Sequence, residues 1–68
     1  MEKILVVEDD VSIRDELITL LRANGYAPVL EPPCDLALLD INLPGESGYE
    51  ICRRLRETSD IPVIFLTA

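Results

Sequence analysis

Hydrophobic residues in this chain gather into short unbroken runs, and stretches with helical periodicity separate them. Residues 4–7, 36–39 and 63–66 are apolar at every position, and residues 27–30 form a further run of this kind. Strands that are covered on both faces have this pattern, because neither face of the strand meets water. The pattern therefore predicts four short strands of a parallel sheet with helices on its faces.

The segment after the first run has the spacing of an amphipathic helix. Asp10 or Ser12 is expected to cap its N-terminus, and Gly25 is expected to follow its last turn. The spacing predicts a single apolar stripe, which consists of Ile13, Leu17, Leu20 and Leu21.

A second helix is expected before the last strand. Pro44 and Gly45 predict a turn, and Ser47 and Glu50 then have the spacing of a capping box at a helix N-terminus. The side chains expected to face inward are Ile51, Cys52 and Leu55. The resulting order of strand, helix, strand, strand, helix, strand predicts an α/β fold, doubly wound around a parallel sheet.

The link between the second and third predicted strands is short for this scheme. Only residues 31–35 separate the two runs, and Pro32 and Pro33 lie among them. A crossover between parallel neighbours takes about a dozen residues or more. Either these two strands pair in another way, or this sequence lacks residues of the full protein between Leu30 and Glu31.

Composition narrows the class of function. The formal net charge of the 68 residues is −7, which argues against nucleic-acid binding by this segment but leaves open a DNA-binding domain elsewhere. Cys34 and Cys52 lack the spacing of a zinc site or a CxxC motif, and reduced thiols are expected. No apolar run approaches the roughly 18 residues of a membrane helix, so no membrane contact and a cytoplasmic location are expected.

Carboxylates follow two of the apolar runs directly. Residues 8–10 are all acidic and follow the first run, and Asp40 follows the third. If those strands are neighbours, their carboxyl ends meet at one edge of the sheet, where ligands of such folds bind. Two like charges about 4 Å apart repel by about 4 kcal/mol at an effective dielectric constant of 20. A hard cation such as Mg²⁺ or Mn²⁺ would offset that repulsion, and one aspartate could then attack phosphorus.

The same residues also have structural explanations. Asp10 is expected to act as a helix cap, Asp40 could begin an Asx turn, and Thr67 could be an ordinary strand end. Spacing alone leaves both the metal site and these structural roles open.

Three ordered segments resemble the receiver domain of bacterial two-component response regulators, and most closely the OmpR/PhoB subfamily of winged-helix transcription factors. The segments are residues 4–10, 35–50 and 61–68. The resemblance implies a flavodoxin-like sheet with strand order 2-1-3-4-5, of which residues 1–68 would form a partial receiver domain. The family pattern also includes a helix between the second and third strands, and a fifth strand with a lysine beyond Ala68.

The resemblance implies a role for individual residues. Asp40 would be the phosphoacceptor, and Thr67 would contact the phosphoryl group and shift on activation. Mg²⁺ would be held by Glu8, Asp9, Asp40 and the backbone carbonyl of Asn42. A sensor histidine kinase would supply the phosphoryl group, and phosphorylation would favour a homodimer that binds DNA through a separate C-terminal domain.

Two other classes of function stay open at this point. A Mg²⁺-dependent phosphatase of the haloacid-dehalogenase kind also uses an aspartate at a strand end, but it needs a second acid two residues later, where this chain has Asn42. An interaction module that works without phosphorylation would keep the fold alone, and the missing lysine would favour it.

Overall fold

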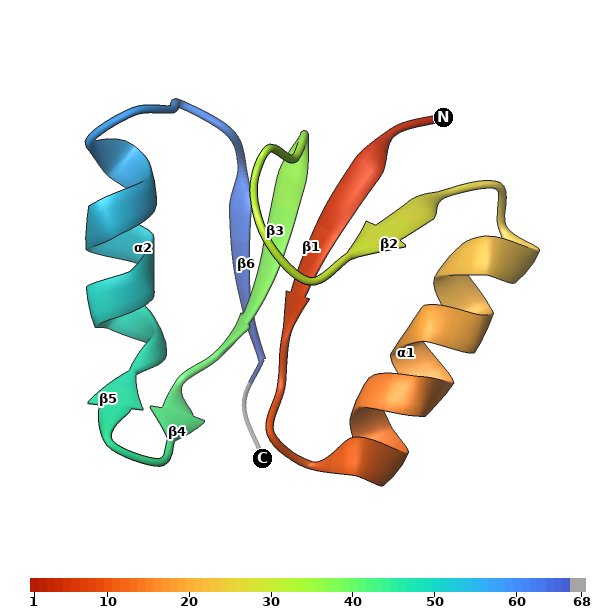
Figure 1. Cartoon of the computed structure of the whole chain (residues 1–68), viewed down its shortest axis with the longest axis horizontal. Helices are drawn as coiled ribbons and strands as arrows, with labels where there is room; N and C mark the ends of the chain where they lie inside the picture. The colour runs from red at the N-terminus through yellow and green to blue at the C-terminus, as the bar shows by residue number, and fades with distance from the viewer. Residues whose placement is uncertain (67–68) are drawn as a thin grey trace.

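The computed structural model describes residues 1–66, and within them four strands pair in parallel in the order β2-β1-β3-β6 (Figure 1). The strands are β1 (Lys3–Val7), β2 (Ala27–Val29), β3 (Leu36–Asp40) and β6 (Val63–Leu66). The helices are α1 (Val11–Ala23) and α2 (Gly48–Arg56), and a small antiparallel hairpin joins β4 (Asn42–Leu43) to β5 (Glu46–Ser47). Each of the four predicted strands is confirmed to within one residue at either end.

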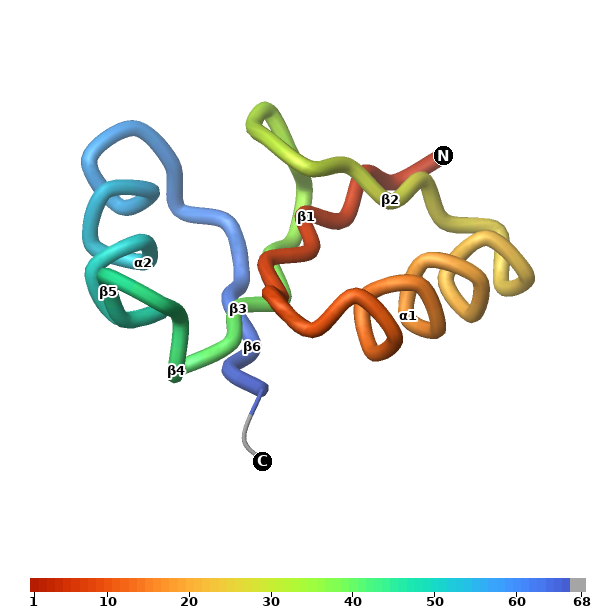
Figure 2. Tube along the Cα trace, turned by 60° about the horizontal axis from the view of Figure 1, so that its bottom comes forward, coloured from red at the N-terminus to blue at the C-terminus, as the bar shows by residue number. Residues whose placement is uncertain are grey.

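Helices cover both faces of the sheet, as the unbroken apolar runs predict. Successive side chains of a strand point to opposite faces. On one face, Leu5, Ala37 and Leu39 pack with Leu55 of α2 into the buried core. Ile4 and Val6 are buried on the other face, where α1 contacts β1 and β2. Figures 1 and 2 show α1 and α2 on opposite sides of the sheet.

The ends of α1 follow from local hydrogen bonding. Asp10 is the N-cap, and its carboxylate accepts a hydrogen bond of 3.1 Å from the amide of Ile13. At the other end, Gly25 has a φ of 85° and its amide donates to the carbonyl of Arg22, while Tyr26 donates to Leu21. This is a Schellman motif, which needs a left-handed residue just after the helix. Both predicted ends of the helix are confirmed.

The predicted apolar stripe of α1 is only half covered. Leu17 and Leu21 are partly buried, but Ile13 and Leu20 are 47% and 60% exposed. Within residues 1–66, the stripe is therefore covered on one side and exposed on the other. The reason is the position of α1, which contacts β1 and β2 and leaves the far side of its stripe uncovered by the other elements within residues 1–66.

A short hairpin lies before α2, at the position where the sequence predicts a turn. Pro44 and Gly45 connect β4 to β5, and Gly45 has a φ of 82°, which suits the third position of a type II turn. Ser47 then caps α2 by accepting a hydrogen bond of 3.4 Å from the amide of Glu50. The Glu50 carboxylate pairs with Arg53, so among the described contacts only the Ser47 half of the predicted capping box is seen.

The short link between β2 and β3 crosses the sheet without a helix. Both strands pair with β1, one on each side, and residues 30–35 carry the chain from the end of β2 back to the start of β3. Because β2 has only three residues, this distance is short enough for an extended segment. The structure therefore has the first of the two alternatives, since β2 and β3 each pair with β1 and not with each other, and the absence of residues after Leu30 stays a prediction.

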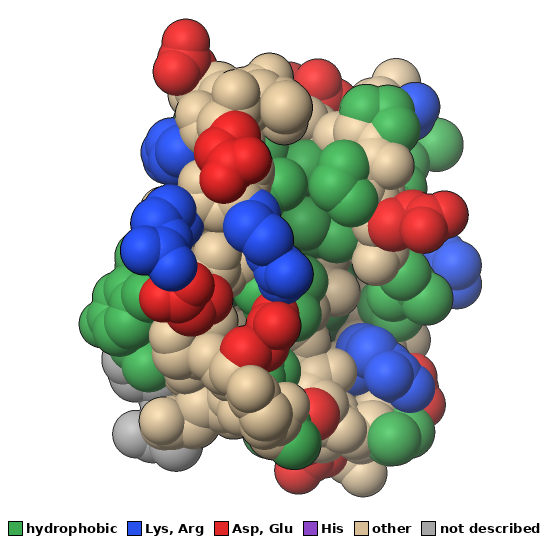
Figure 3. All heavy atoms as spheres, turned by 60° about the vertical axis from the view of Figure 1, so that its left-hand side comes forward, with side chains coloured by type: hydrophobic (Ala, Val, Ile, Leu, Met, Phe, Trp, Pro, Cys, Tyr) green, Lys and Arg blue, Asp and Glu red, His purple; other side chains and the backbone are tan. Residues whose placement is uncertain are grey.

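The bare link leaves an apolar groove beside α2. The groove has a volume of about 340 Å³ and is lined by Leu5, Val7, Leu30, Glu31, Pro32, Ile51, Arg54, Leu55 and Thr58. Figure 3 shows apolar side chains gathered in a hollow next to the charged surface of α2.

Neither helix within residues 1–66 has the length and apolar content that a membrane crossing requires.

Replacing Leu39 with alanine is expected to lower the free energy of unfolding by about 2–5 kcal/mol, because the side chain is wholly buried and its removal leaves a cavity. Urea denaturation followed by circular dichroism measures the change. The matched variant Leu20→Ala removes the same atoms from an exposed site and should change stability by no more than about 0.5 kcal/mol. Similar losses in both variants would contradict the assignment of the core.

Candidate metal centre

The pairing of β1 with β3 brings two acidic segments to one edge of the sheet. Val7 lies opposite Leu39 in the register, so Glu8 and Asp40 are the next residues on neighbouring strands. One oxygen from each of Glu8, Asp9 and Asp40 lies within 4.8 Å of the other two. Figure 2 turns this edge of the sheet forward. The predicted clustering of these three acids is therefore found in the structure.

Backbone amides fix two of the clustered carboxylates. The amide of Asp10 donates to Oε1 of Glu8 at 3.0 Å, and the amide of Asn42 donates to Oδ1 of Asp40 at 3.0 Å. The second bond is the Asx-type turn that the sequence left open as an alternative for Asp40. The turn and a chemical role are compatible, because the turn engages one oxygen of the carboxylate.

Asp10 has a structural role that differs from the role expected of Glu8 and Asp9. Its Oδ1 accepts the amide of Ile13 as the cap of α1, and it does not belong to the group of three mutually close acids. The expected division between Asp10 as a cap and Glu8 and Asp9 as candidate ligands therefore agrees with the geometry.

The pKa of Glu8 lies above its ordinary value of 4.5. The hydrogen bond from the Asp10 amide lowers this pKa, but partial burial and the neighbouring carboxylates of Asp40 and Asp9 together outweigh it. Partial burial is the larger cause of the rise, and the neighbouring carboxylates add to it, so the charged form of Glu8 is disfavoured. A bound cation would reverse this effect.

The donor set fits a hard divalent cation. The three acids open onto a hollow of about 450 Å³, which is lined by Glu8, Asp9, Asp10, Ile13, Leu17, Asp40, Asn42 and Leu66. Carboxylate and carbonyl oxygens are the ligands that Mg²⁺ and Mn²⁺ take, and within this lining neither imidazole nor thiol is present to favour zinc. Asn42 borders the hollow, as its predicted role requires, whereas Thr67 lies outside the described residues.

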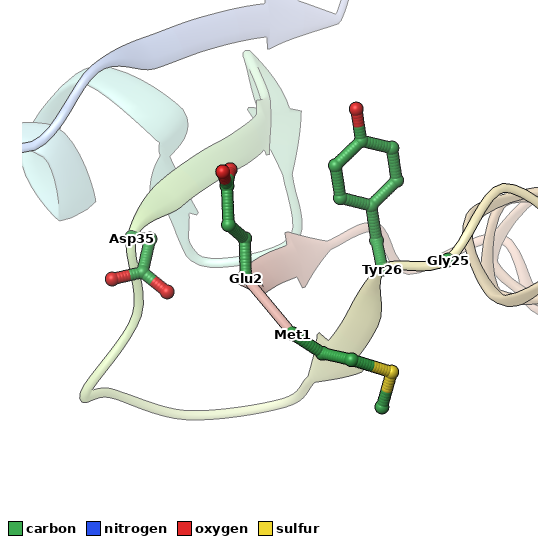
Figure 4. Close-up of a pocket in the computed structure, with 5 residues that line it drawn as sticks. All are labelled: Met1, Glu2, Gly25, Tyr26 and Asp35. Carbon is green, nitrogen blue, oxygen red and sulfur yellow. The ribbon is translucent and has the colours of Figure 1, made fainter.

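A second hollow lies near the opposite edge of the sheet. It has a volume of about 700 Å³ and is lined by Met1, Glu2, Gly25, Tyr26 and Asp35. Figure 4 shows that the side chains of Glu2, Tyr26 and Asp35 do not converge on a common point. The Asp35 carboxylate accepts the amide of Lys3 at 2.7 Å, which is a structural role at the start of β3. This hollow therefore lacks the convergent groups of a chemical site.

The chain is thus an α/β protein with a doubly wound parallel sheet, and three carboxylates cluster at the ends of its two central strands. The family model of the response regulator receiver domain matches residues 28–68, more than half of the chain. The chain therefore belongs to the response regulator receiver family, and the resemblance drawn from the three sequence segments is confirmed.

Curated relatives support the assignment to the OmpR/PhoB subfamily. The transcriptional regulatory protein BaeR of Escherichia coli O6:H1 is 42% identical over 78 aligned positions, which cover 97% of this chain and 32% of BaeR. The sensory transduction protein RegX3 of Mycobacterium tuberculosis H37Rv is 40% identical over 80 positions, which cover 100% of this chain and 35% of RegX3. Both are OmpR-family regulators, and the chain spans about a third of the length of these curated relatives.

Solved structures confirm the fold. The response regulator TrrA from Thermotoga maritima, in complex with Mg²⁺-BeF, superposes with a TM-score of 0.89 at 34% identity and covers 100% of this chain and 70% of that one. TrrA in complex with the histidine kinase ThkA gives a TM-score of 0.85 with the same identity and coverage. The order β2-β1-β3-β6 is the part of the predicted 2-1-3-4-5 order that the described residues contain.

The raised pKa of Glu8 predicts how stability depends on pH. The folded state binds this proton more tightly than the unfolded state, so the stability that Glu8 contributes is fully present below about pH 4.5 and is lost as the pH rises through the raised pKa. Glu8→Gln is therefore expected to raise the free energy of unfolding at pH 7, by no more than about 1 kcal/mol because water screens this partly exposed group.

The measurement is urea denaturation in metal-free buffer at pH 7 and at about pH 3.5, where the gain should disappear. Glu16→Gln on α1 removes the same charge far from the cluster and serves as the control. An equal gain in both variants, or a gain that persists in acid, would show that general net charge is responsible.

Proposed function

We propose that Asp40 is a phosphoacceptor and that this chain receives a phosphoryl group in a two-component signalling system. The observation that carries the proposal is the group of Glu8, Asp9 and Asp40, whose oxygens lie within 4.8 Å of one another at the ends of β1 and β3. Of these three acids, Asp40 is the last residue of β3, which lies between β1 and β6 in the sheet.

The reaction is a transfer to a carboxylate oxygen. The Asn42 amide holds Oδ1 of Asp40 at 3.0 Å, and the second oxygen attacks phosphorus. A bond forms between that oxygen and phosphorus, the bond from phosphorus to the donor atom breaks, and its electron pair leaves with the donor. The product is an acyl phosphate. Positioning and electrostatics are the main contributions of the protein to such a step.

Mg²⁺ or Mn²⁺ would be held by Glu8, Asp9, Asp40 and the backbone carbonyl of Asn42. When bound, the cation supplies positive charge that offsets the carboxylates and the incoming phosphoryl oxygens. The raised pKa of Glu8 and the oxygen-rich hollow support this assignment. The Mg²⁺-BeF complex of TrrA, at 34% identity, supports it as well.

We further propose that the phosphoryl donor is a sensor histidine kinase, which the complex of TrrA with ThkA supports. Thr67 is proposed to contact the phosphoryl group and to act as the switch. A homodimer and DNA binding by a separate C-terminal domain would be the output, as the names of the DNA-binding relatives suggest. We infer a cytoplasmic location, which the free thiols of Cys34 and Cys52 support.

Asp40→Asn is expected to abolish labelling by acetyl phosphate in the presence of Mg²⁺, because an amide cannot form the acyl phosphate. The label should be labile at high pH, and removal of Mg²⁺ with EDTA should also abolish it. Intact mass spectrometry measures the addition of one phosphoryl group.

Asp60→Asn, in an exposed loop, is the matched control and should label like the parent protein. Full labelling of Asp40→Asn would overturn the proposal. Steady turnover of a phosphate ester by the parent protein would point to the phosphatase class instead.

We also propose that the domain is a receiver that lacks the crossover helix between β2 and β3. The RegX3 comparison spans 80 aligned positions for the 68 residues of this chain, so twelve positions of RegX3 have no counterpart here. The bare link at residues 30–35 and the apolar groove beside α2 indicate where such a segment would lie.

Insertion of a twelve-residue amphipathic helix between Leu30 and Glu31 is expected to raise the free energy of unfolding, on the order of 1–2 kcal/mol, because its apolar face would cover the groove. A twelve-residue glycine-serine insertion is the control, and it should lower stability by about 1 kcal/mol through loop entropy. Urea denaturation distinguishes the two. A loss of stability with both insertions would contradict the proposed position.

A further inference from the structure

We propose that Gly48 is a positioning residue for Asp40, and this inference rests on the proposed function of Asp40 as the phosphoacceptor. Gly48 is buried and is the first residue of α2. It lies against the backbone that follows β3, at the point where the chain leaves the acidic cluster. Its sequence position, just after the Ser47 cap, gives no sign of this contact.

The backbone of Gly48 is hydrogen-bonded to the residue that follows β3. Its amide donates to the carbonyl of Ile41 at 3.0 Å, next to the β4–β5 pairing of Asn42 with Ser47. The first turn of α2 is thereby joined to the residue that follows Asp40. The Ile41 carbonyl and the Asn42 amide belong to the same peptide group, and this amide donates to Oδ1 of Asp40.

The contact leaves no room for a side chain at position 48. A Cβ atom there would lie 2.2 Å from the carbonyl oxygen of Asp40, 2.9 Å from its carbonyl carbon and 3.2 Å from Cα of Ile41. The atoms that would have to move belong to the backbone. Gly48 does not have a positive φ, unlike Gly25 and Gly45, so the requirement for glycine is one of space and not of backbone conformation.

A larger residue at position 48 would displace the backbone beside Asp40 and with it the Asp40 carboxylate. Pairing with β1 as far as Leu39 and with β6 as far as Asp40 holds β3 in place, so the strain of a larger residue falls on the peptide that follows. The Asn42 amide, which holds Oδ1 of Asp40 at 3.0 Å, is only one residue further along. Restoring an ordinary contact requires a shift of about 1 Å, and a misplacement of that size can slow a positioned reaction by about 100-fold.

A purely helical role for position 48 predicts the opposite result. Alanine is a better helix former than glycine and reduces the freedom of the unfolded chain, so Gly48→Ala would then stabilise the protein and leave labelling unchanged. The two explanations therefore differ in the sign of the stability change as well as in the rate.

The experiment compares Gly48→Ala with Gly25→Ala in the full chain. Gly25 has a φ of 85° and open space around its Cβ position, so its alanine variant carries backbone strain far from Asp40. Both variants are expected to be less stable than the parent protein. Labelling by acetyl phosphate with Mg²⁺ at saturating donor, corrected for the folded fraction, should slow by roughly 10- to 100-fold in Gly48→Ala alone.

A second measurement follows the Asn42 amide by ¹⁵N NMR, which does not depend on phosphorylation. The resonance should shift in Gly48→Ala and stay in place in Gly25→Ala. If the parent protein is not labelled, the proposed function of Asp40 fails, and the Asn42 resonance still tests the contact at Gly48. An osmolyte such as trimethylamine N-oxide restores the folded fraction of an unstable variant.

A folded Gly48→Ala that labels at the parental rate would overturn the inference. An unshifted Asn42 resonance in that variant would overturn it as well. A Gly48→Ala variant that stays unfolded in the osmolyte, while Gly25→Ala folds, would also overturn it, because position 48 would then be essential to the whole fold and not specific to Asp40.

Discussion

The parallel pairing of β1 with β3 is the constraint on which the rest of the structure depends. It sets Val7 opposite Leu39, so the residues that follow these two strands leave the sheet at the same edge. The same pairing places Leu5, Ala37 and Leu39 on one face, where they form the core with Leu55. The buried core and the acidic cluster are therefore two results of one register, and a slip by one residue would lose both.

Backbone hydrogen bonds hold the carboxylates of the acidic cluster in place although their negative charges repel one another. Partial burial and the neighbouring carboxylates of Asp40 and Asp9 raise the pKa of Glu8, while amides from Asp10 and Asn42 fix the carboxylates of Glu8 and Asp40. Both hydrogen bonds come from amides two positions along the chain, so they order the site without help from distant side chains. The fold thus prepares a site whose remaining electrostatic cost a cation can offset.

The two faces of the sheet are covered unequally. α2 has Leu55 buried and contributes to the main core, whereas α1 has no buried residue and leaves Ile13 and Leu20 exposed. On the face with α2, the extended link between β2 and β3 leaves a groove where the other crossovers have helices. The site lies away from this groove, at the carboxyl edge, because strand register and not helix coverage determines its geometry.

The sequence by itself determined the strands, both helix caps and the identity of the three clustered acids, because unbroken apolar runs, capping residues and strand-end carboxylates are local signals. The order of the strands followed from the resemblance to the receiver family, whereas only the tertiary structure decided how much of the α1 stripe is covered and how the short link crosses the sheet. It alone showed the close approach of Gly48 to Asp40. These features depend on atoms that are distant in the chain or on backbone geometry, and no local pattern of residues records such distances.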